Sequence, residues 1–311
     1  MCAIYGFLDY GKKIPHRVLS KLLKEISIVA ECRGTDATGI SYVKDNKIVT
    51  YKKAKPAHKV KLYFPKDTTA LIGHNRMTTQ GNEKYNFNNH PFEGKTGNGS
   101  FSLAHNGILH NDRDLQKSEL LPKTHIETDS YVAVQLLEKC GSVCTNTLKE
   151  VSEKLRGTFV LTVLRDDSTL YLVKGDNPIT LLHFPKIGLY LYASTTDILY
   201  KAMKSARFTE PFEKIDIDTG DIVKIDSNGN ISKNHFHCDE GYSWRWYMGM
   251  NEERENELYI FAGYYGIDVD DIDLLLEFGY SYDEIEEMFS DRQLFETTMA
   301  ELRAVCEEVT T

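Results

Sequence analysis

Residues 2–8 read Cys-Ala-Ile-Tyr-Gly-Phe-Leu, a short apolar run that begins with a thiol. A run of four to eight apolar residues is typical of a buried β-strand. Downstream, Pro15 precedes a stretch in which apolar side chains recur at helical spacing as far as Val29. The beginning of the chain therefore predicts a buried strand followed by an amphipathic helix.

The rest of the chain up to residue 235 is rich in predicted strands. Helices are expected at 129–140, with Thr128 as N-cap, at 146–155 and after Asp197. The polar stretch from Thr78 to Ser100 predicts a long irregular loop, and loops of that length are usually functional. Further strands are expected at 39–43, 47–51, 69–74, 101–105, 158–165, 169–174, 179–183 and 188–193, with a last hairpin at 213–234. Many strands with a few helices among them predict an α+β layered domain.

Composition excludes several classes of protein. Of 311 residues, 41% are hydrophobic and 27% charged, which is the profile of a globular chain. The net charge of −9 argues against a general nucleic-acid-binding role, because phosphate backbones require a basic surface. No apolar run is long enough to cross a membrane, and we expect no secretory signal. The six cysteines are scattered without a CxxC pair, so a reducing, cytoplasmic setting is expected and no metal site.

Charge divides the chain into two parts. From residue 251 to 311 there are 18 acidic and 3 basic residues, a net charge of −15, whereas residues 1–250 carry the remaining 34 basic and 28 acidic residues. This asymmetry predicts a domain at 2–235 and an acidic helical region of unknown role at 236–311. The acidic face of region 236–311 is either simply solvated or a docking surface for a basic partner.

Cys2 is the first residue whose chemical groups suit a catalytic role. If the initiator methionine is removed, Cys2 carries a thiol nucleophile and an α-amine base in one residue. The unperturbed pKa of an α-amine is about 7.7–8.0, so an appreciable fraction is unprotonated near neutral pH. Such an amine can accept the thiol proton without a catalytic histidine. Taken alone, a cysteine in second position is more often a small buried hydrophobe.

Six short motifs share one order and similar spacings with a known family. They are Cys2–Gly6 (CAIYG), Arg33–Gly39 (RGTDATG), Gly73–Gly81 (GHNRMTTQG), His90-Pro91, His105–Gly107 (HNG) and Glu127–Asp129 (ETD). Together they resemble the class II (N-terminal nucleophile) glutamine amidotransferases over roughly residues 2–225. The resemblance implies a four-layer αββα sandwich, followed here by a small C-terminal helical region.

The resemblance also implies site residues. It makes Cys2 the nucleophile, with Asn106 and Gly107 stabilising the oxyanion. Without it, the Asn-Gly pair is better explained as a β-turn, since Asn-Gly is a common turn pair. Donors aimed at a developing oxyanion are what acyl transfer needs, and glycine leaves its backbone N–H accessible.

The substrate-binding residues follow in the same way. Arg76, with Thr79 beside it, matches the clamp for the glutamine α-carboxylate, which suits the fork of a guanidinium. Asp129 matches the aspartate that receives the α-ammonium group. Read without the motifs, Arg76 is a surface ion pair and Asp129 an acid in a first helical turn.

Other matched positions are implied to be structural. They are Arg33, Gly34, Asp36 and His90. Two positions depart from the family, since many members have histidine in place of Gln80 and an aromatic residue in place of Met77.

The function implied is hydrolysis of the glutamine side-chain amide through a Cys2 thioester. No phosphate-binding loop of the GxxxxGK[ST] type occurs, and the region after residue 235 is too short for the usual ammonia-using domains. We therefore expect ammonia to be supplied to a separate acceptor enzyme, without metal or organic cofactor. Two alternatives remain: a self-contained amidohydrolase acting on another γ-glutamyl or acyl amide, and a non-catalytic regulatory protein on the same scaffold. The acceptor, its pathway and the oligomeric state are not indicated by the sequence.

Overall fold

The computed structural model describes residues 2–237, 258–259, 262, 265–289 and 291–309. Contacts divide the chain into two compact units, Met1–Cys238 and Asp239–Thr311.

The first unit is built on two antiparallel sheets. One contains β1 (Ala3–Asp9), β2 (Ala37–Lys44), β3 (Lys47–Lys53), β4 (Ala70–Arg76), β9 (Thr180–Phe184), β10 (Leu189–Ala193) and β11 (Glu213–Ile215), in the order β11-β9-β10-β1-β4-β2-β3. The other contains β5 (Phe92–Thr96), β6 (Gly99–Leu109), β7 (Gly157–Arg165), β8 (Leu170–Lys174), β12 (Asp221–Ile225) and β13 (Ile231–His235), in the order β13-β12-β8-β7-β6-β5.

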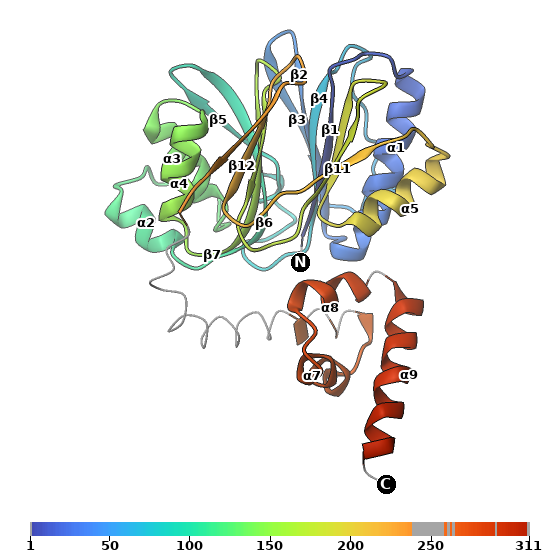
Figure 1. Ribbon diagram of the computed structural model, residues 1–311. Helices are drawn as coiled ribbons and strands as arrows, with labels where there is room; N and C mark the ends of the chain where they lie inside the picture. The colour runs from blue at the N-terminus through green and yellow to red at the C-terminus, as the bar shows by residue number, and fades with distance from the viewer. Residues whose placement is uncertain (1, 238–257, 260–261, 263–264, 290, 310–311) are drawn as a thin grey trace. The chain divides into compact units, whose positions relative to one another are not determined.

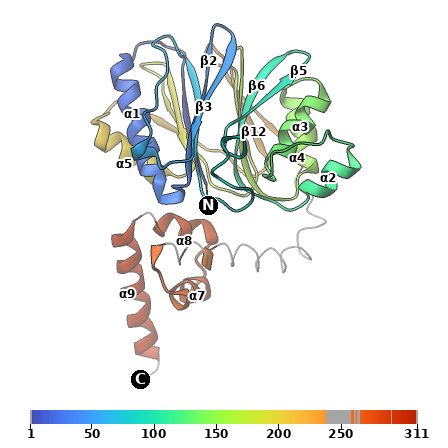
Figure 2. The same ribbon diagram turned by 180° about the vertical axis from the view of Figure 1, so that it is seen from behind.

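Helices cover the outer face of each sheet. The helices α1 (His16–Val29) and α5 (Thr196–Ala206) lie on the seven-stranded sheet, and α3 (Tyr131–Cys140) and α4 (Thr145–Lys154) on the six-stranded one (Figure 1). Figure 2 shows the same succession of layers from behind. The predicted four-layer αββα sandwich is therefore confirmed. Short elements complete the unit: α2 (Asp112–Ser118) and the 3₁₀ turns η1 (Ala30–Arg33), η2 (Ala57–Lys59) and η3 (Asn86–Asn88).

Strand alternation explains why this sequence needs helices outside and a second sheet inside. In β1, Tyr5 and Phe7 pack into the core under α1 and α5, whereas Ile4 and Leu8 pack into the core between the sheets. Successive side chains of a strand point to opposite faces, so an all-apolar strand must be covered on both. Each large apolar side chain buried in this way contributes about 1.5–3 kcal/mol.

Three expectations differ in detail from the structure. The predicted hairpin at 213–234 is split, because β11 pairs with β9 in one sheet while β12 and β13 form a hairpin in the other. The stretch expected to be an irregular loop contains β5, which pairs with β6. The helix expected from residue 129 begins at Tyr131, with Ser130 rather than Thr128 at the N-cap position.

The second unit is helical where it is described. It contains α7 (Val269–Glu277), α8 (Tyr282–Phe289) and α9 (Arg292–Val309). Ser281 and Glu284 form the predicted capping box, with the Ser281 N–H donating to Glu284 Oε2 at 2.8 Å and the Glu284 N–H donating to Ser281 Oγ at 3.4 Å. Across the described residues of both units, every helix is too short or too polar to span a bilayer.

Candidate active site

Strand register and alternation direct three of the predicted site residues, Cys2, Arg76 and Asn106, toward the layer between the sheets. Ala3 is paired with Asn75, so Cys2 lies level with Arg76 on the neighbouring strand. Ile72 of β4 and Ala104 of β6 belong to the core between the sheets. Because side chains two residues apart along a strand share a face, Arg76 and Asn106 point toward that layer as well.

The thiol of Cys2 lies against the backbone of Met77. The Met77 N–H donates to Cys2 Sγ at 3.4 Å, and the thiol faces the Met77 carbonyl oxygen at 3.4 Å. Burial raises the pKa of the Cys2 thiol; Arg76 opposes this shift and Asp129 adds to it. Both charges therefore act on the thiol. Since the protonated form is favoured, attack by Cys2 requires a group that accepts its proton.

The residues expected to be structural surround this end of β1 and β4. Arg33 Nε donates to the Cys2 carbonyl at 3.0 Å. A Cβ on Gly34 would lie 2.5 Å from the carbonyl carbon of Arg76, so only glycine permits this approach. Asp36 Oδ2 accepts from the Thr78 N–H at 2.7 Å. These contacts fix the backbone that carries both Cys2 and Arg76.

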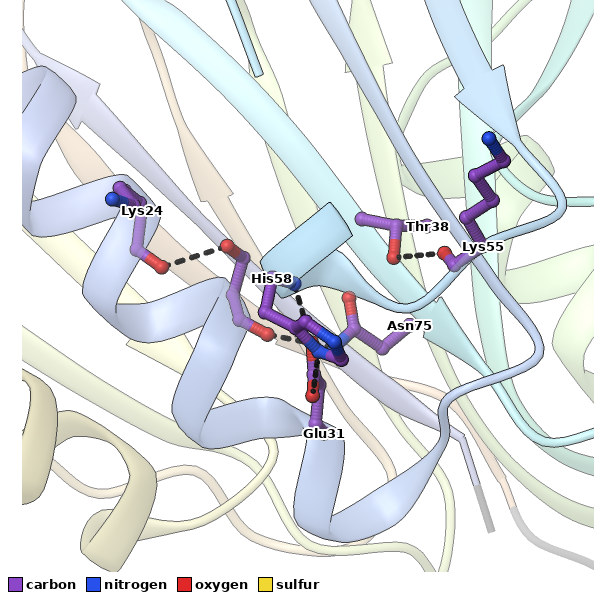
Figure 3. Close-up of polar contacts among 7 residues, drawn as sticks. Lys24, Glu31, Thr38, Lys55, His58 and Asn75 are labelled. Carbon is purple, nitrogen blue, oxygen red and sulfur yellow. Dashed lines mark hydrogen bonds and ion pairs between the residues drawn. The ribbon is translucent and has the colours of Figure 1, made fainter. Parts of the chain in front are cut away.

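A second set of contacts anchors the outer face of the same strand end. Asn75 Nδ2 donates to the Ser27 carbonyl of α1 at 2.8 Å (Figure 3). Nearby, Glu31 accepts from the His58 N–H at 2.6 Å, and Thr38 Oγ1 donates to the Lys55 carbonyl at 2.9 Å. The end of β4 is thus tied to α1, and the segment after β3 is tied to η1 and β2.

Arg76 is buried, and its guanidinium group already has partners. Nη1 donates to Asn89 Oδ1 at 2.6 Å, and Nη2 donates to the carbonyls of Gln80 and, at 3.2 Å, Gly81. A carboxylate that binds Arg76 must therefore use its remaining N–H groups or displace a loop carbonyl. Thr79, the predicted second contact, is exposed.

Glu127, the first residue of the ETD motif, is hydrogen-bonded to the loop between β4 and β5. Glu127 Oε2 accepts from Asn88 Nδ2 at 2.7 Å and from the Asn82 N–H at 3.2 Å. Gln80, one of the two positions expected to depart from the family pattern, donates to the Glu127 carbonyl at 3.0 Å. Glutamine at this position therefore joins the loop to the motif that supplies Asp129.

Asn106 and Gly107, the predicted oxyanion donors, lie next to each other in a closely packed part of β6. Asn106 is fully buried, and neither side-chain amide atom has a partner among the residues described. Buried polar groups are otherwise almost always hydrogen-bonded, so an unpartnered amide marks a place for a ligand or water. Gly107 has φ +139°, and a Cβ there would lie 2.0 Å from the Thr158 carbonyl oxygen. Only glycine fits this backbone.

Asp129 is buried just before α3. Its Oδ2 accepts from the Leu109 N–H at 2.6 Å, and its Oδ1 from Ser130 Oγ at 3.2 Å. Ser130 Oγ in turn lies 2.7 Å from Nδ1 of His105. This chain of hydrogen bonds joins β6 to the aspartate and orients its carboxylate.

Sequence reasoning missed several residues around the site. His74 Nε2 donates to the His105 carbonyl at 3.0 Å, joining the two sheets next to the site. Burial lowers the pKa of His74 to about 3. His90, predicted to be structural, stacks on His74 at 4.2 Å, and burial lowers its pKa as well. Lys52 Nζ donates to the carbonyls of Asn89 (2.6 Å) and Pro91 (3.0 Å). Lys52 is one of three lysines in β3, and nothing in the sequence of this strand indicated these two hydrogen bonds.

No protein-family model matches the chain. It is 28% identical over 244 residues to glutamine–fructose-6-phosphate aminotransferase (isomerizing) of Staphylococcus aureus, a match that covers 74% of this chain and 38% of that enzyme. The same enzyme of Staphylococcus epidermidis is 32% identical over 190 residues, covering 58% of this chain and 30% of that one. The chain therefore spans well under half of the length of these relatives.

Solved structures agree on the fold. Glutamine phosphoribosylpyrophosphate amidotransferase from B. subtilis superposes with a TM-score of 0.60 at 18% identity, covering 76% of this chain and 50% of that one. A structure of the allosteric regulatory enzyme of purine biosynthesis gives 0.61 at 19% identity, with the same coverage. The fold is that of an N-terminal nucleophile hydrolase. With the six motifs and the curated relatives, it makes the chain similar to the class II glutamine amidotransferases, which are enzymes.

Proposed function

We propose that this chain hydrolyses the side-chain amide of glutamine through a thioester on Cys2 and supplies the ammonia to a separate acceptor enzyme. One observation carries the proposal. The thiol of the second residue lies at the end of the layer between the sheets, level with Arg76 and within reach of the charge of Asp129. The buried, unpartnered amide of Asn106 points toward the same layer.

The proposed reaction begins once Met1 has been removed. The α-amine of Cys2 takes the thiol proton, and the thiolate attacks the amide carbon of glutamine. The oxyanion that forms is stabilised by Asn106 and the Gly107 N–H. The α-ammonium group returns the proton to the departing nitrogen, the C–N bond breaks, and ammonia leaves. Water then attacks the thioester, releasing glutamate and restoring the thiol.

Substrate recognition is assigned to Arg76 and Asp129. A free amino acid presents one carboxylate and one ammonium group, and a buried arginine and a buried aspartate complement the pair. Thr79, exposed in the loop beside Arg76, is proposed to add a contact to the α-carboxylate.

The acceptor is proposed to dock on the acidic region that follows residue 235. Ammonia released into water is mostly protonated and no longer nucleophilic, so a protected route to a partner is of advantage. The net charge of −15 over residues 251–311 suits a basic partner surface. If a chain lacking this region still binds the acceptor with unchanged affinity, the tail is not the docking site. A cytoplasmic location is part of the same proposal.

Replacement of the nucleophile tests the chemistry. In Cys2→Ala, glutamate production from glutamine should vanish, and a glutamine-analogue electrophile should no longer label the chain. The matched control is Cys140→Ala, which removes a thiol at the end of α3, on the outer side of the six-stranded sheet. Turnover that survives in Cys2→Ala rules out a thioester on this residue.

Two further measurements separate the alternatives. Intact-mass spectrometry should show a chain that begins at Cys2, because an amide-linked Cys2 nitrogen has no basic lone pair. An enzyme that ignores glutamine but cleaves another γ-glutamyl amide through Cys2 would be a self-contained amidohydrolase. A chain with a free Cys2 amine that cleaves neither would be a non-catalytic relative.

A further inference from the structure

Asn177 lies in the loop between β8 and β9, outside the six motifs, and it contacts the candidate oxyanion donors directly. Its side chain is fully buried, and Nδ2 donates to the carbonyl oxygen of Asn106 at 2.9 Å. The same Nδ2 would lie 2.7 Å from a Cβ on Gly107. The amide of Asn177 therefore packs on the peptide group that joins Asn106 to Gly107.

The loop that carries Asn177 is itself fixed. The Gly175 N–H donates to the Phe159 carbonyl at 2.9 Å, and Phe159 is the strand partner of Gly107 in β7. Lys174 Nζ donates to the Asn177 carbonyl at 3.4 Å. The side-chain amide of Asn177 thus contacts β6 from a loop whose backbone is hydrogen-bonded to the adjacent strand β7.

The orientation of the amide follows from its partner. If the Asn177 amide were reversed, its oxygen would face the Asn106 oxygen at 2.9 Å, and two acceptors would repel each other. With nitrogen toward Asn106, Oδ1 is buried with no partner in the described part of the chain. An unpartnered buried oxygen lowers stability, so a buried amide at this position implies that the hydrogen bond from Asn177 Nδ2 to the Asn106 carbonyl serves a purpose.

We infer that Asn177 is a positioning residue for the oxyanion site, a role that rests on the proposed amidase function. In a trans peptide the C=O and N–H point in opposite directions. By holding the Asn106 carbonyl on one side, Asn177 fixes where the Gly107 N–H points on the other. A hydrogen bond accepted by the carbonyl also polarises the peptide group and strengthens its N–H as a donor. Asn177 touches neither the substrate nor the sulfur in this scheme.

The test uses two variants of the full chain with native Cys2. Asn177→Asp keeps the shape but cannot donate, and Asn177→Leu is similar in size and uncharged. Losing one oxyanion donor outright slows an acyl-transfer enzyme about 100- to 1,000-fold. Since Asn177 acts through the peptide group, we expect kcat for glutamate release to fall about 10- to 100-fold, with KM for glutamine within about two-fold of wild type.

Iodoacetamide separates positioning from a general structural role. Alkylation of Cys2 by iodoacetamide displaces iodide at a saturated carbon and builds no oxyanion, so its rate should be unchanged in both variants. The matched control is Gln135→Glu, because Gln135 of α3 is also buried, donates to a backbone carbonyl (Pro122, 2.6 Å) and leaves its Oε1 without a partner among described residues. Its kcat should stay within about two-fold of wild type.

Each other outcome overturns the inference. An unchanged kcat in both variants would show that the bond to Asn106 does not serve the reaction. Equal losses of kcat and of alkylation rate, or unfolding of both variants, would make Asn177 a structural residue only. Wild-type chain that begins at Cys2 yet releases no glutamate from glutamine would overturn the proposed function, and this inference with it.

Discussion

Replacing Gly107 with alanine adds one methyl group where the structure leaves no room for it. The new Cβ would lie 2.0 Å from the Thr158 carbonyl oxygen and 2.6 Å from its carbonyl carbon, whereas ordinary contacts begin at 3.4 Å. The closer contact is thus short by 1.4 Å, the difference between 3.4 and 2.0 Å, and the obstacle is backbone of the adjacent strand. Neither strand can yield without disturbing β-sheet hydrogen bonds.

The cost has two parts. An L residue at φ +139° is strained by about 1–3 kcal/mol. Overpacking a close-packed interior adds about 1–3 kcal/mol. The free energy of unfolding should therefore fall by about 2–6 kcal/mol in Gly107→Ala. For a unit of this size, each kcal/mol lowers Tm by about 2–4 °C.

Gly141 supplies the matched control. It also has positive φ (+74°), at the end of α3, but a Cβ there meets nothing within 4 Å. Gly141→Ala should cost only the left-handed strain, about 1–2 kcal/mol. Urea denaturation of both variants measures the difference, and glutamate release measures the effect at the site. Equal losses of stability in the two variants would refute the steric argument for Gly107.

Three further predictions concern charges near the site. Asp129→Asn should raise KM for glutamine at least about tenfold, because the α-ammonium group of glutamine loses its counter-charge. Alkylation of Cys2 should be unimpaired, because the hydrogen bonds of the side chain are largely kept. An unchanged KM in steady-state kinetics would show that Asp129 does not bind the substrate. Burial lowers the pKa of His74 to about 3, so below about pH 6.5 the folded chain binds fewer protons than the unfolded chain. The free energy of unfolding should therefore fall on acidification below that pH, by up to about 1.4 kcal/mol per pH unit. In denaturation experiments between pH 4 and 7, this free energy should depend less steeply on pH in His74→Gln than in wild type. Burial lowers the pKa of Lys52 to about 8, so between pH 8 and 10.5 unfolding takes up a proton. Over that range the stability of wild type should rise with pH relative to that of Lys52→Met. Parallel curves of stability against pH for the two proteins would contradict the burial of the Lys52 ammonium group.

Much of the fold could be predicted because it depends on local pattern. The apolar run at residues 2–8 became β1, and the helical spacing after Pro15 became α1. The capping pair at Ser281 formed as expected, since its two hydrogen bonds span only three residues. The layer count was implied by the resemblance to a known family, because the pattern of the strands alone predicted only an α+β domain.

Elements that depend on distant partners were missed. The three residues of β11 carry little pattern of their own, and they join the seven-stranded sheet only because β9 presents an open edge to them. Similarly, β5 contains a glycine and alternates over just five residues, so its pairing with β6 decides its structure. Short strands take their conformation from hydrogen bonds to neighbours far along the chain.

The site shows the same division. Each motif residue was identified by type and order, and these assignments remain predictions until the variants are tested. Asn177 lies 71 residues from Asn106, and Lys52 lies 37 residues from Asn89, so no local pattern links either pair. The hydrogen bonds from Arg76 to the carbonyls of Gln80 and Gly81 could likewise not be predicted from the sequence.

The sequence by itself determined which chemical groups are available: a thiol in second position, an arginine, an aspartate and an Asn-Gly pair in a recognisable order. Only the tertiary structure decided that strand register brings Cys2 level with Arg76 and points Asn106 into the same layer. The physical reason is that side-chain direction alternates with every residue along a strand, so a slip of one position would turn each of these groups to the opposite face.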